Sequence, residues 1–380
     1  MTDPPSRPLH LGLLSTYPPT QCGLATFNAA LWQNLVDQPG GASVVRAVDS
    51  PEPRVGREVV AHLVHDDPAS LADAARVLNT HDVVLVQHEY GIYGGLDGAD
   101  VVTVMEALTV PTIVVLHTVL ERPRPNQRWV LERLIDEADL VVTMTEAGRQ
   151  RLIDHYFVDP TKAHVVPHGA DGPAPLSRRR QAHGRPTILT WGLLGPGKGV
   201  EWAIEALASL RDLNPRYIVL GKTHPKVLES AGERYREGLV RHAARHGVLD
   251  LVEFDDRYLT TGELAPIVDL ASVVLLPYDS EDQVTSGVLV EAVAAGRPVV
   301  STAFPHAAEL LAEGLGLVVP QRDSTAIAAA LRRVLTEPGL AESMSDRAEL
   351  TSPDLLWGAV AQRYRALADD LVARRLAVVS

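Results

Sequence analysis

A glycine-rich segment, GLLGPGKG at residues 192–199, has the composition of a phosphate-binding loop. It follows an apolar, strand-like run and precedes a helical pattern. Glycines let backbone N–H groups approach an anion, and the start of a helix adds positive potential. Lys198 adds a full charge and is one of only four lysines in the chain. The segment therefore predicts a phosphate site built on Gly192 and Lys198, with a solvated turn as the structural alternative.

The same segment comes close to the P-loop of nucleotide hydrolases. A P-loop needs a Ser or Thr directly after its lysine, because that hydroxyl group holds magnesium. Gly199 occupies this position. The sequence therefore disfavours a P-loop nucleotidase, which stays open only as a lesser alternative.

A second segment, residues 283–300, puts the carboxylate of Glu291 on an otherwise apolar helix. A buried carboxylate costs several kcal/mol unless partners satisfy it. The diol of a ribose would be such a partner, and so would an arginine or a backbone amide of the protein. Gln283 lies about 12 Å from Glu291 if this stretch is helical, which is comparable to the span of a nucleotide-sugar. The unpaired N–H groups that begin the helix are expected on Ser286, Gly287 and Val288.

In these residues the chain resembles the retaining glycosyltransferases of family 4, which have the GT-B fold. That family carries a Glu, seven further residues, a second Glu and then a Gly-x-Pro-Val turn before a strand. Glu291 matches the second Glu and residues 296–299 match the turn, whereas Gln283 replaces the first Glu.

The resemblance covers nearly the whole chain. Gly192 and the Lys198-Gly199 pair match the family's phosphate loop, although Leu193 occupies its arginine position. The segment PHGAD, residues 167–171, resembles the family's interdomain Pro-Asn-Gly-Val-Asp.

The resemblance implies a metal-independent enzyme with no cofactor, which moves a hexose from a UDP- or GDP-linked donor to a hydroxyl group of a sugar, glycan or small molecule. The leaving phosphate would help to deprotonate the acceptor on the same face of the sugar, so no protein nucleophile is required, and the enzyme would stabilise the developing negative charge. The catalytic residues that the resemblance implies are His117, Lys198 and Gln283.

The first half of the chain is expected to supply the acceptor side. The family places a glycine-containing loop after its first strand, where Gly23 would lie beside the donor phosphates and Thr26 beside the acceptor. The end of a second strand carries polar and aromatic groups suited to binding a sugar acceptor. The alternative is that these groups only pack within the domain. The expected acceptor residues at this strand end are His88, Glu89 and Tyr90.

Two further residues are expected in the donor site of the second half because each follows a strand. Lys222 is predicted to contact phosphate or base, with a solvated loop lysine as the alternative. Arg257 is predicted to lie next to the base.

Short apolar strands alternate with helical patterns, which is typical of parallel sheets covered on both faces. Strands are predicted at residues 10–15, 43–48, 58–64, 82–87, 111–117, 140–144, 164–167, 187–191, 217–220, 251–254, 272–276, 298–301 and 317–319. Helices are predicted near residues 25–36, 69–78, 128–137, 146–156, 201–212, 227–246, 287–295, 307–312, 325–336 and 355–374.

The rhythm of strands and helices breaks at residues 173–186, which are rich in Pro, Gly and Arg and are predicted to be an interdomain linker. The prediction is an α/β fold of GT-B architecture, with two Rossmann-like doubly wound domains facing a central cleft. The first domain is expected over residues 1–172 together with a returning helix at about 355–380, and the second over residues 187–354. Ligands bind at the carboxyl ends of strands in such sheets.

Composition narrows the class of protein. The net charge of −13 disfavours nucleic acid and anionic lipid as partners. The longest apolar runs are strand-length, so no membrane segment is expected. A single cysteine excludes internal disulfides and a cysteine-based zinc site, and we expect a cytoplasmic enzyme. The oligomeric state is not predicted.

Two readings besides the nucleotidase stay open. A GT-B nucleotide-sugar epimerase would consume the donor without an acceptor. A catalytically inactive sugar-binding protein would be compatible with Leu193 and Gln283, and turnover of a donor would exclude it.

Overall fold

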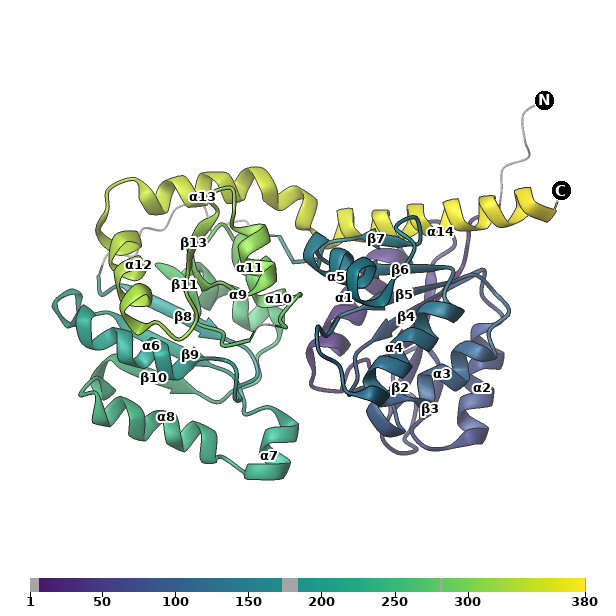
Figure 1. Cartoon of the computed structure of the whole chain (residues 1–380), viewed down its shortest axis with the longest axis horizontal. Coiled ribbons are helices and arrows are strands. Elements are labelled where there is room, and N and C mark those ends of the chain that lie inside the picture. The colour runs from purple at the N-terminus through teal and green to yellow at the C-terminus, as the bar shows by residue number, and fades with distance from the viewer. Residues whose placement is uncertain (1–6, 173–183, 281, 380) are drawn as a thin grey trace. The chain divides into compact units, whose positions relative to one another are not determined.

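The computed structural model describes residues 7–172, 184–280 and 282–379. The chain forms two compact units, Met1–Gly169 with Trp357–Ser380 and Ala170–Leu356, each built on a parallel sheet with helices on both faces (Figure 1). This arrangement confirms the predicted class of two doubly wound α/β units. Most of the predicted linker, residues 173–183, lies outside the described residues.

The first unit contains a seven-stranded sheet in which all pairs are parallel. Its strands, in order across the sheet, are β3 (Val59–Val64), β2 (Ala42–Val48), β1 (Leu11–Ser15), β4 (Val83–His88), β5 (Thr112–Leu116), β6 (Leu140–Thr143) and β7 (Ala163–Val165). The chain leaves β1 toward β2 on one side and returns to β4 on the other. The carboxyl ends of β1 and β4 therefore flank the switch point where such sheets bind ligands.

Helices cover both faces of this sheet. The helices are α1 (Gly23–Val36), α2 (Pro68–Leu78), α3 (Asp100–Glu106), α4 (Pro125–Glu137), α5 (Glu146–Tyr156) and α14 (Trp357–Val379), with a 3-10 turn η1 (Leu96–Gly98). On one face α1 packs against α14, where Leu31 and Tyr364 have no exposed surface. The final helix of the chain thus belongs to the core of the first unit.

The second unit contains a six-stranded parallel sheet. Its strands, in order, are β10 (Val252–Asp255), β9 (Arg216–Leu220), β8 (Thr187–Trp191), β11 (Val273–Leu276), β12 (Val299–Thr302) and β13 (Gly316–Val319). Its helices are α6 (Val200–Leu207), α7 (Pro225–Ala231), α8 (Arg234–Arg245), α9 (Thr261–Asp269), α10 (Gly287–Ala294), α11 (Pro305–Leu310), α12 (Ser324–Thr336) and α13 (Leu340–Thr351), with 3-10 turns η2 (Ala208–Leu213), η3 (Leu249–Leu251) and η4 (Ser352–Leu355). The switch point lies between β8 and β11.

The inner strands β9 and β11 of the second unit are almost entirely apolar because both of their faces are buried. Along β9, Tyr217 and Val219 enter the core under α6, α8 and α12, whereas Ile218 and Leu220 enter the core under α9, α10 and α11. Successive side chains point to opposite faces of a strand. A strand buried on both faces therefore has no polar alternation, which is the pattern that the sequence shows.

The predicted elements need two corrections. The single helix predicted at residues 227–246 is two helices, α7 and α8, because Gly232 ends α7 with a φ of 59°. The sequence patterns also missed three helices. These are α3, which is short and rich in valine, α9, which contains Gly262 and Pro266, and α13, which is largely polar.

The ring of Trp357 anchors the start of α14 within the first unit. It packs edge-on against Phe27 with a centroid distance of 4.9 Å and is 6% exposed. A Cβ atom built on Gly169 would lie 2.2 Å from this ring. Glycine is therefore required at this position by close packing.

We predict that Gly169→Ala destabilises the first unit, because the added methyl group must displace the Trp357 ring. Overpacking of this kind costs about 1–3 kcal/mol. Urea unfolding followed by tryptophan fluorescence measures the loss. Gly172→Ala is the matched control, since its methyl group would lie 3.8 Å from Leu356. Equal midpoints for the two variants would contradict the packing argument.

Candidate donor and acceptor sites

The glycine loop between β8 and α6 lies against the segment that follows β11. Gly192, Gly197 and Gly199 have φ angles of 115°, 88° and 63°. A Cβ atom on Gly199 would lie 1.8 Å from the carbonyl oxygen of Pro277, and the amide of Asp279 donates to the oxygen of Gly197 at 2.9 Å. The contact explains why no Ser or Thr follows Lys198, because a side chain at Gly199 would collide with the backbone.

The Lys198 ammonium lies over an aromatic face supplied by the same segment. Its Nζ atom is 4.3 Å from the centroid of the Tyr278 ring. Tyr278 is 2% exposed and stacks on Phe304 at 5.1 Å. A cation over a fixed aromatic ring gains about 0.5–2 kcal/mol. The cation–π contact therefore holds the charge of Lys198 beside the carboxyl ends of β8 and β11.

The start of α10 carries the backbone amides that the sequence assigns to phosphate. Ser286 caps this helix by accepting a hydrogen bond from the amide of Leu289 at 3.3 Å. The amides of Gly287 and Val288 belong to the first turn, which has no intrahelical acceptor for them. A Cβ atom on Gly192 would lie 3.7 Å from a methyl group of Val288. The glycine loop and this helix start are therefore neighbours.

His306, which the sequence interpretation did not single out, orders the segment before α10. Its Nδ1 atom accepts a hydrogen bond from the amide of Ser286 at 2.8 Å, and its ring is 4% exposed. Its own amide donates to the oxygen of Gln283 at 3.5 Å. Its position could have indicated this role, because His306 follows β12 and the carboxyl end of β12 lies at the same edge of the sheet as those of β8 and β11.

The side chain of Gln283 folds back onto its own loop. Its amide group donates to the carbonyl oxygen of Thr285. The carbonyl oxygen of the preceding residue, Asp282, accepts a hydrogen bond from the amide of Val284 at 2.8 Å. The catalytic role of Gln283 stays a prediction.

Glu291 has a protein partner that the sequence did not reveal. The indole N–H of Trp191, the last residue of β8, donates to its Oε2 atom at 3.1 Å. Burial, opposed by the Trp191 hydrogen bond and helped by the nearby charge of Asp171, raises the pKa of Glu291 to about 7. The carboxyl group is thus partly protonated at neutral pH and can both donate and accept hydrogen bonds.

Lys222 and Arg257 follow strands on the other side of β8. The loop of Lys222 is hydrogen-bonded to the glycine loop, since the amide of Leu194 donates to the oxygen of Lys222 at 2.8 Å. Arg257 pairs with Asp255 at 2.6 Å, and this contact lowers the pKa of the Asp255 carboxyl. Arg257 lines a groove of about 330 Å³ over Ile218.

The structure thus brings most of the predicted donor residues to one edge of the second sheet. Gly192, Lys198, Val288 and Glu291 meet at the switch point, with Ser286 and Gly287 at the same helix start and Lys222 one strand away. Arg257 follows β10, two strands from β8. The roles of these residues in binding a donor stay predictions.

In the first unit, His117 lies at the carboxyl end of β5. Its Nε2 atom is 2.7 Å from Oε1 of Gln87, and the ring of Phe27 packs edge-on at 4.8 Å. Burial, together with smaller effects of His168 and His88, lowers the pKa of His117 to about 3. The imidazole is neutral at pH 7, so Nε2–H donates to Gln87 and Nδ1 is an acceptor suited to a hydroxyl group.

Of the predicted acceptor residues at the end of β4, His88 is buried and Glu89 and Tyr90 are partly exposed. His88 has no exposed surface, and burial lowers its pKa to about 3. Among the described residues, neither its ring nitrogens nor the Tyr90 hydroxyl has a hydrogen-bond partner. Glu89 accepts from the Thr118 hydroxyl group and from the Tyr90 amide. Their acceptor role stays a prediction.

The loop after β1 leads directly into α1. Gly23 is the first residue of this helix, and a Cβ atom there would meet nothing within 4 Å. The Cys22 sulfur caps the helix by accepting from the amide of Ala25 at 3.4 Å. Thr26 is exposed, and its hydroxyl group donates to the oxygen of Cys22. Packing therefore does not require the glycine, which leaves the predicted roles of Gly23 and Thr26 open.

Comparison with known proteins gives the same class from both halves of the chain. Residues 185–337 match the family described as Glycosyl transferases group 1, and residues 37–172 match Glycosyltransferase Family 4. The D-inositol 3-phosphate glycosyltransferase of Kineococcus radiotolerans is 30% identical over 305 residues, which is 70% of this chain and 68% of that protein. The glycogen synthase of Mycobacterium tuberculosis (strain ATCC 25618 / H37Rv) is 31% identical over 234 residues, 60% of this chain and 53% of that enzyme.

Solved structures share the fold over nearly the whole chain. The structure of Anabaena HepE in complex with UDP and glucose has a TM-score of 0.76 at 15% identity, covering 95% of this chain and 100% of that one. A glycosyltransferase from Rickettsia africae has a TM-score of 0.75 at 13% identity, covering 96% and 98%. The chain belongs to the family 4 glycosyltransferases and has their GT-B fold. It is a transferase, and among its described residues no helix is both long and apolar enough to cross a bilayer.

The raised pKa of Glu291 predicts a pH dependence of stability without any ligand. Its folded-state pKa of about 7 exceeds the value in the unfolded chain, so folding takes up a proton between the two values. The stability due to this group is fully present below about pH 4.5 and is lost as pH rises through 7, by about 3 kcal/mol. Glu291→Gln should remove this loss.

Urea unfolding of the wild type and Glu291→Gln at pH 5 and pH 8 measures the effect. The variant should gain stability relative to the wild type at the higher pH. Glu229→Gln, on the exposed side of α7, is the matched control and should show the same offset at both pH values. An equal offset for Glu291→Gln would show that the carboxyl group does not titrate in this way.

Proposed function

We propose that the protein is a retaining, metal-independent hexosyltransferase that uses a UDP- or GDP-linked sugar and a hydroxyl acceptor. The observation that carries this is the convergence of Lys198, the α10 amides and Glu291 at the β8–β11 switch point. A fixed cation and a helix start suit a pyrophosphate, and the carboxyl group suits a ribose diol. Structures of HepE in complex with UDP and with UDP-glucose favour UDP-linked sugars as the first donors to test.

In this proposal each residue acts on charge or position. Lys198 and the amides of Gly287 and Val288 stabilise the negative charge that grows on the leaving diphosphate. Glu291 orients the nucleotide through its ribose. His117, neutral and held by Gln87, accepts a hydroxyl hydrogen bond from the donor sugar, while Gln283 selects among donor sugars. The leaving phosphate takes the acceptor proton.

The first acceptors to test come from the names of the relatives. Several are D-inositol 3-phosphate glycosyltransferases, so a cyclitol phosphate is a reasonable first candidate beside simple sugars. The single cysteine fits a reducing compartment, and we expect the enzyme to act in the cytoplasm.

The test is turnover of UDP- and GDP-hexoses with a panel of hydroxyl acceptors, with and without EDTA. The expected result is acceptor-dependent release of the nucleoside diphosphate and a product with the anomeric configuration of the donor. Chelation should leave the rate unchanged. Donor consumption that is independent of any acceptor would instead mean an epimerase, and ATP hydrolysis alone would mean a nucleotidase. The comparisons favour neither alternative.

Lys198→Ala should lower kcat by roughly 10²–10³, because loss of one preorganised group that stabilises developing charge has this effect. KM for the donor should change less, since the phosphate charge grows in the transition state. Steady-state kinetics with the identified donor measures both constants. Lys226→Ala, an exposed lysine on α7, is the control and should keep the wild-type kcat. A near-normal kcat in folded Lys198→Ala would contradict this role, and Lys222 would be the next candidate for stabilising the phosphate charge.

Glu291→Gln should weaken donor binding. Losing a charged hydrogen bond to the ribose costs about 1.5–3 kcal/mol, which is roughly 10–150-fold in Kd. Calorimetric titration with the donor measures the change, and circular dichroism checks the fold. Glu229→Gln should bind like the wild type. A folded Glu291→Gln protein with unchanged affinity would rule out the ribose contact.

A further inference from the structure

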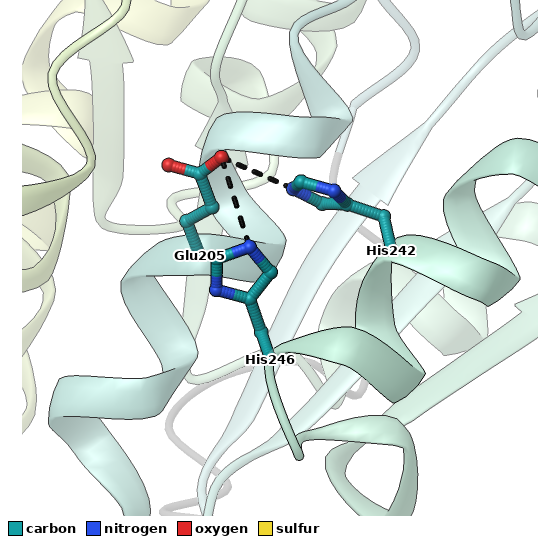
Figure 2. Close-up of side chains that lie close together, drawn as sticks. All are labelled: Glu205, His242 and His246. Carbon is teal, nitrogen blue, oxygen red and sulfur yellow. Dashed lines mark hydrogen bonds and ion pairs between the residues drawn. The ribbon is translucent and has the colours of Figure 1, made fainter.

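Three side chains with metal-binding chemistry meet on helices α6 and α8 of the second unit. Figure 2 shows Glu205 on α6 facing His242 and His246, which lie one helical turn apart on α8 and at its carboxyl-terminal cap. One carboxylate oxygen of Glu205 is 3.1 Å from Nε2 of His242 and 4.0 Å from Nε2 of His246. The two imidazole rings are 4.5 Å apart.

These distances are close to those of a tetrahedral metal site. Zinc binds imidazole nitrogen and carboxylate oxygen at about 2.0–2.2 Å, so its ligand atoms lie roughly 3.3–3.5 Å apart. All three ligand atoms here lie within 4.8 Å of one another, and this is the only such group among the described residues. Small side-chain rotations would complete three ligands of a tetrahedron.

The three side chains are also reachable from solvent. Glu205, His242 and His246 are 25%, 18% and 37% exposed. An ion can therefore enter without unfolding, and water can occupy the fourth position. Two imidazoles and one carboxylate suit zinc and its first-row neighbours, whereas magnesium prefers an all-oxygen shell.

We propose that Glu205, His242 and His246 bind one divalent transition-metal ion, zinc in the first instance, that clamps α8 to α6. The ion would replace the hydrogen bond between Glu205 and His242 with bonds to all three side chains. The proposal rests on this geometry alone and does not depend on the transferase activity. None of the three side chains is among the predicted donor or acceptor residues, so removing the metal should not stop hexosyl transfer.

A fourth side chain, Arg245, favours one tautomer of His242 in the absence of metal. Its guanidinium donates to Nδ1 of His242 at 3.2 Å, which places the ring proton on Nε2, facing Glu205. Metal at Nε2 requires that proton to move to Nδ1, where an arginine cannot accept it. Arg245 therefore opposes metal binding, and Arg245→Gln, whose amide oxygen can accept, should bind zinc more tightly.

The experiment is calorimetric titration of the EDTA-treated, desalted full chain with zinc chloride. One equivalent should bind and raise Tm. Removing a residue that only hydrogen-bonds to a metal ligand typically weakens metal binding 10–100-fold. Removing a ligand itself should therefore weaken zinc binding by about 100-fold or more in each of the variants Glu205→Gln, His242→Ala and His246→Ala. Arg245→Gln should bind more tightly than the wild type. His155→Ala, an exposed histidine of the first unit, is the control and should bind like the wild type.

Cobalt(II) gives an independent readout of geometry. The wild type should develop the intense visible absorption of a tetrahedral cobalt site, and His246→Ala should not. His246 is exposed at the end of α8, so this variant should fold even if His242→Ala does not. Unchanged zinc affinity in the folded His246→Ala variant, or absence of stoichiometric binding by the wild type, would overturn the proposal.

Discussion

The close contact between Gly199 and the carbonyl oxygen of Pro277 is the constraint on which the candidate donor site depends. It presses the loop after β8 onto the loop after β11, so the two strands that flank the switch point share one surface. The segment that Gly199 touches continues into Tyr278, whose ring lies under the Lys198 ammonium. A larger residue at Gly199 would separate the loops and move the cation from its aromatic support.

The same constraint explains why the glycine loop is not a P-loop. Magnesium binding in a P-loop needs a hydroxyl side chain at the position of Gly199. Here that position has a φ of 63° and no space for a Cβ atom. The departure from the motif is therefore a packing requirement, and the loop can offer backbone amides and Lys198 to a phosphate but no hydroxyl ligand to a metal.

The sequence predicted the fold well because most of its strands are buried on both faces, and such strands are recognisable as apolar runs between helices. It also predicted the position of Glu291, since a carboxylate among valines and alanines stands out. The partner of that carboxylate could not be predicted, because Trp191 is a hundred residues earlier and reads as an ordinary strand residue. His306 was missed for the same reason, because it acts through the backbone of a loop that is distant in the sequence.

The two residues that depart from the family pattern, Leu193 and Gln283, change the charge of the donor site in opposite directions. Leu193 removes a positive charge from the phosphate loop, and Gln283 removes a negative charge from the segment before α10. Either loss alone would change the net charge of the donor site by one. Together they leave it unchanged, and the raised pKa of Glu291 to about 7 reduces the remaining negative charge further. A site with one fixed cation, a helix start and a half-titrated carboxyl group is still attractive to a diphosphate, since little negative charge of the protein opposes it.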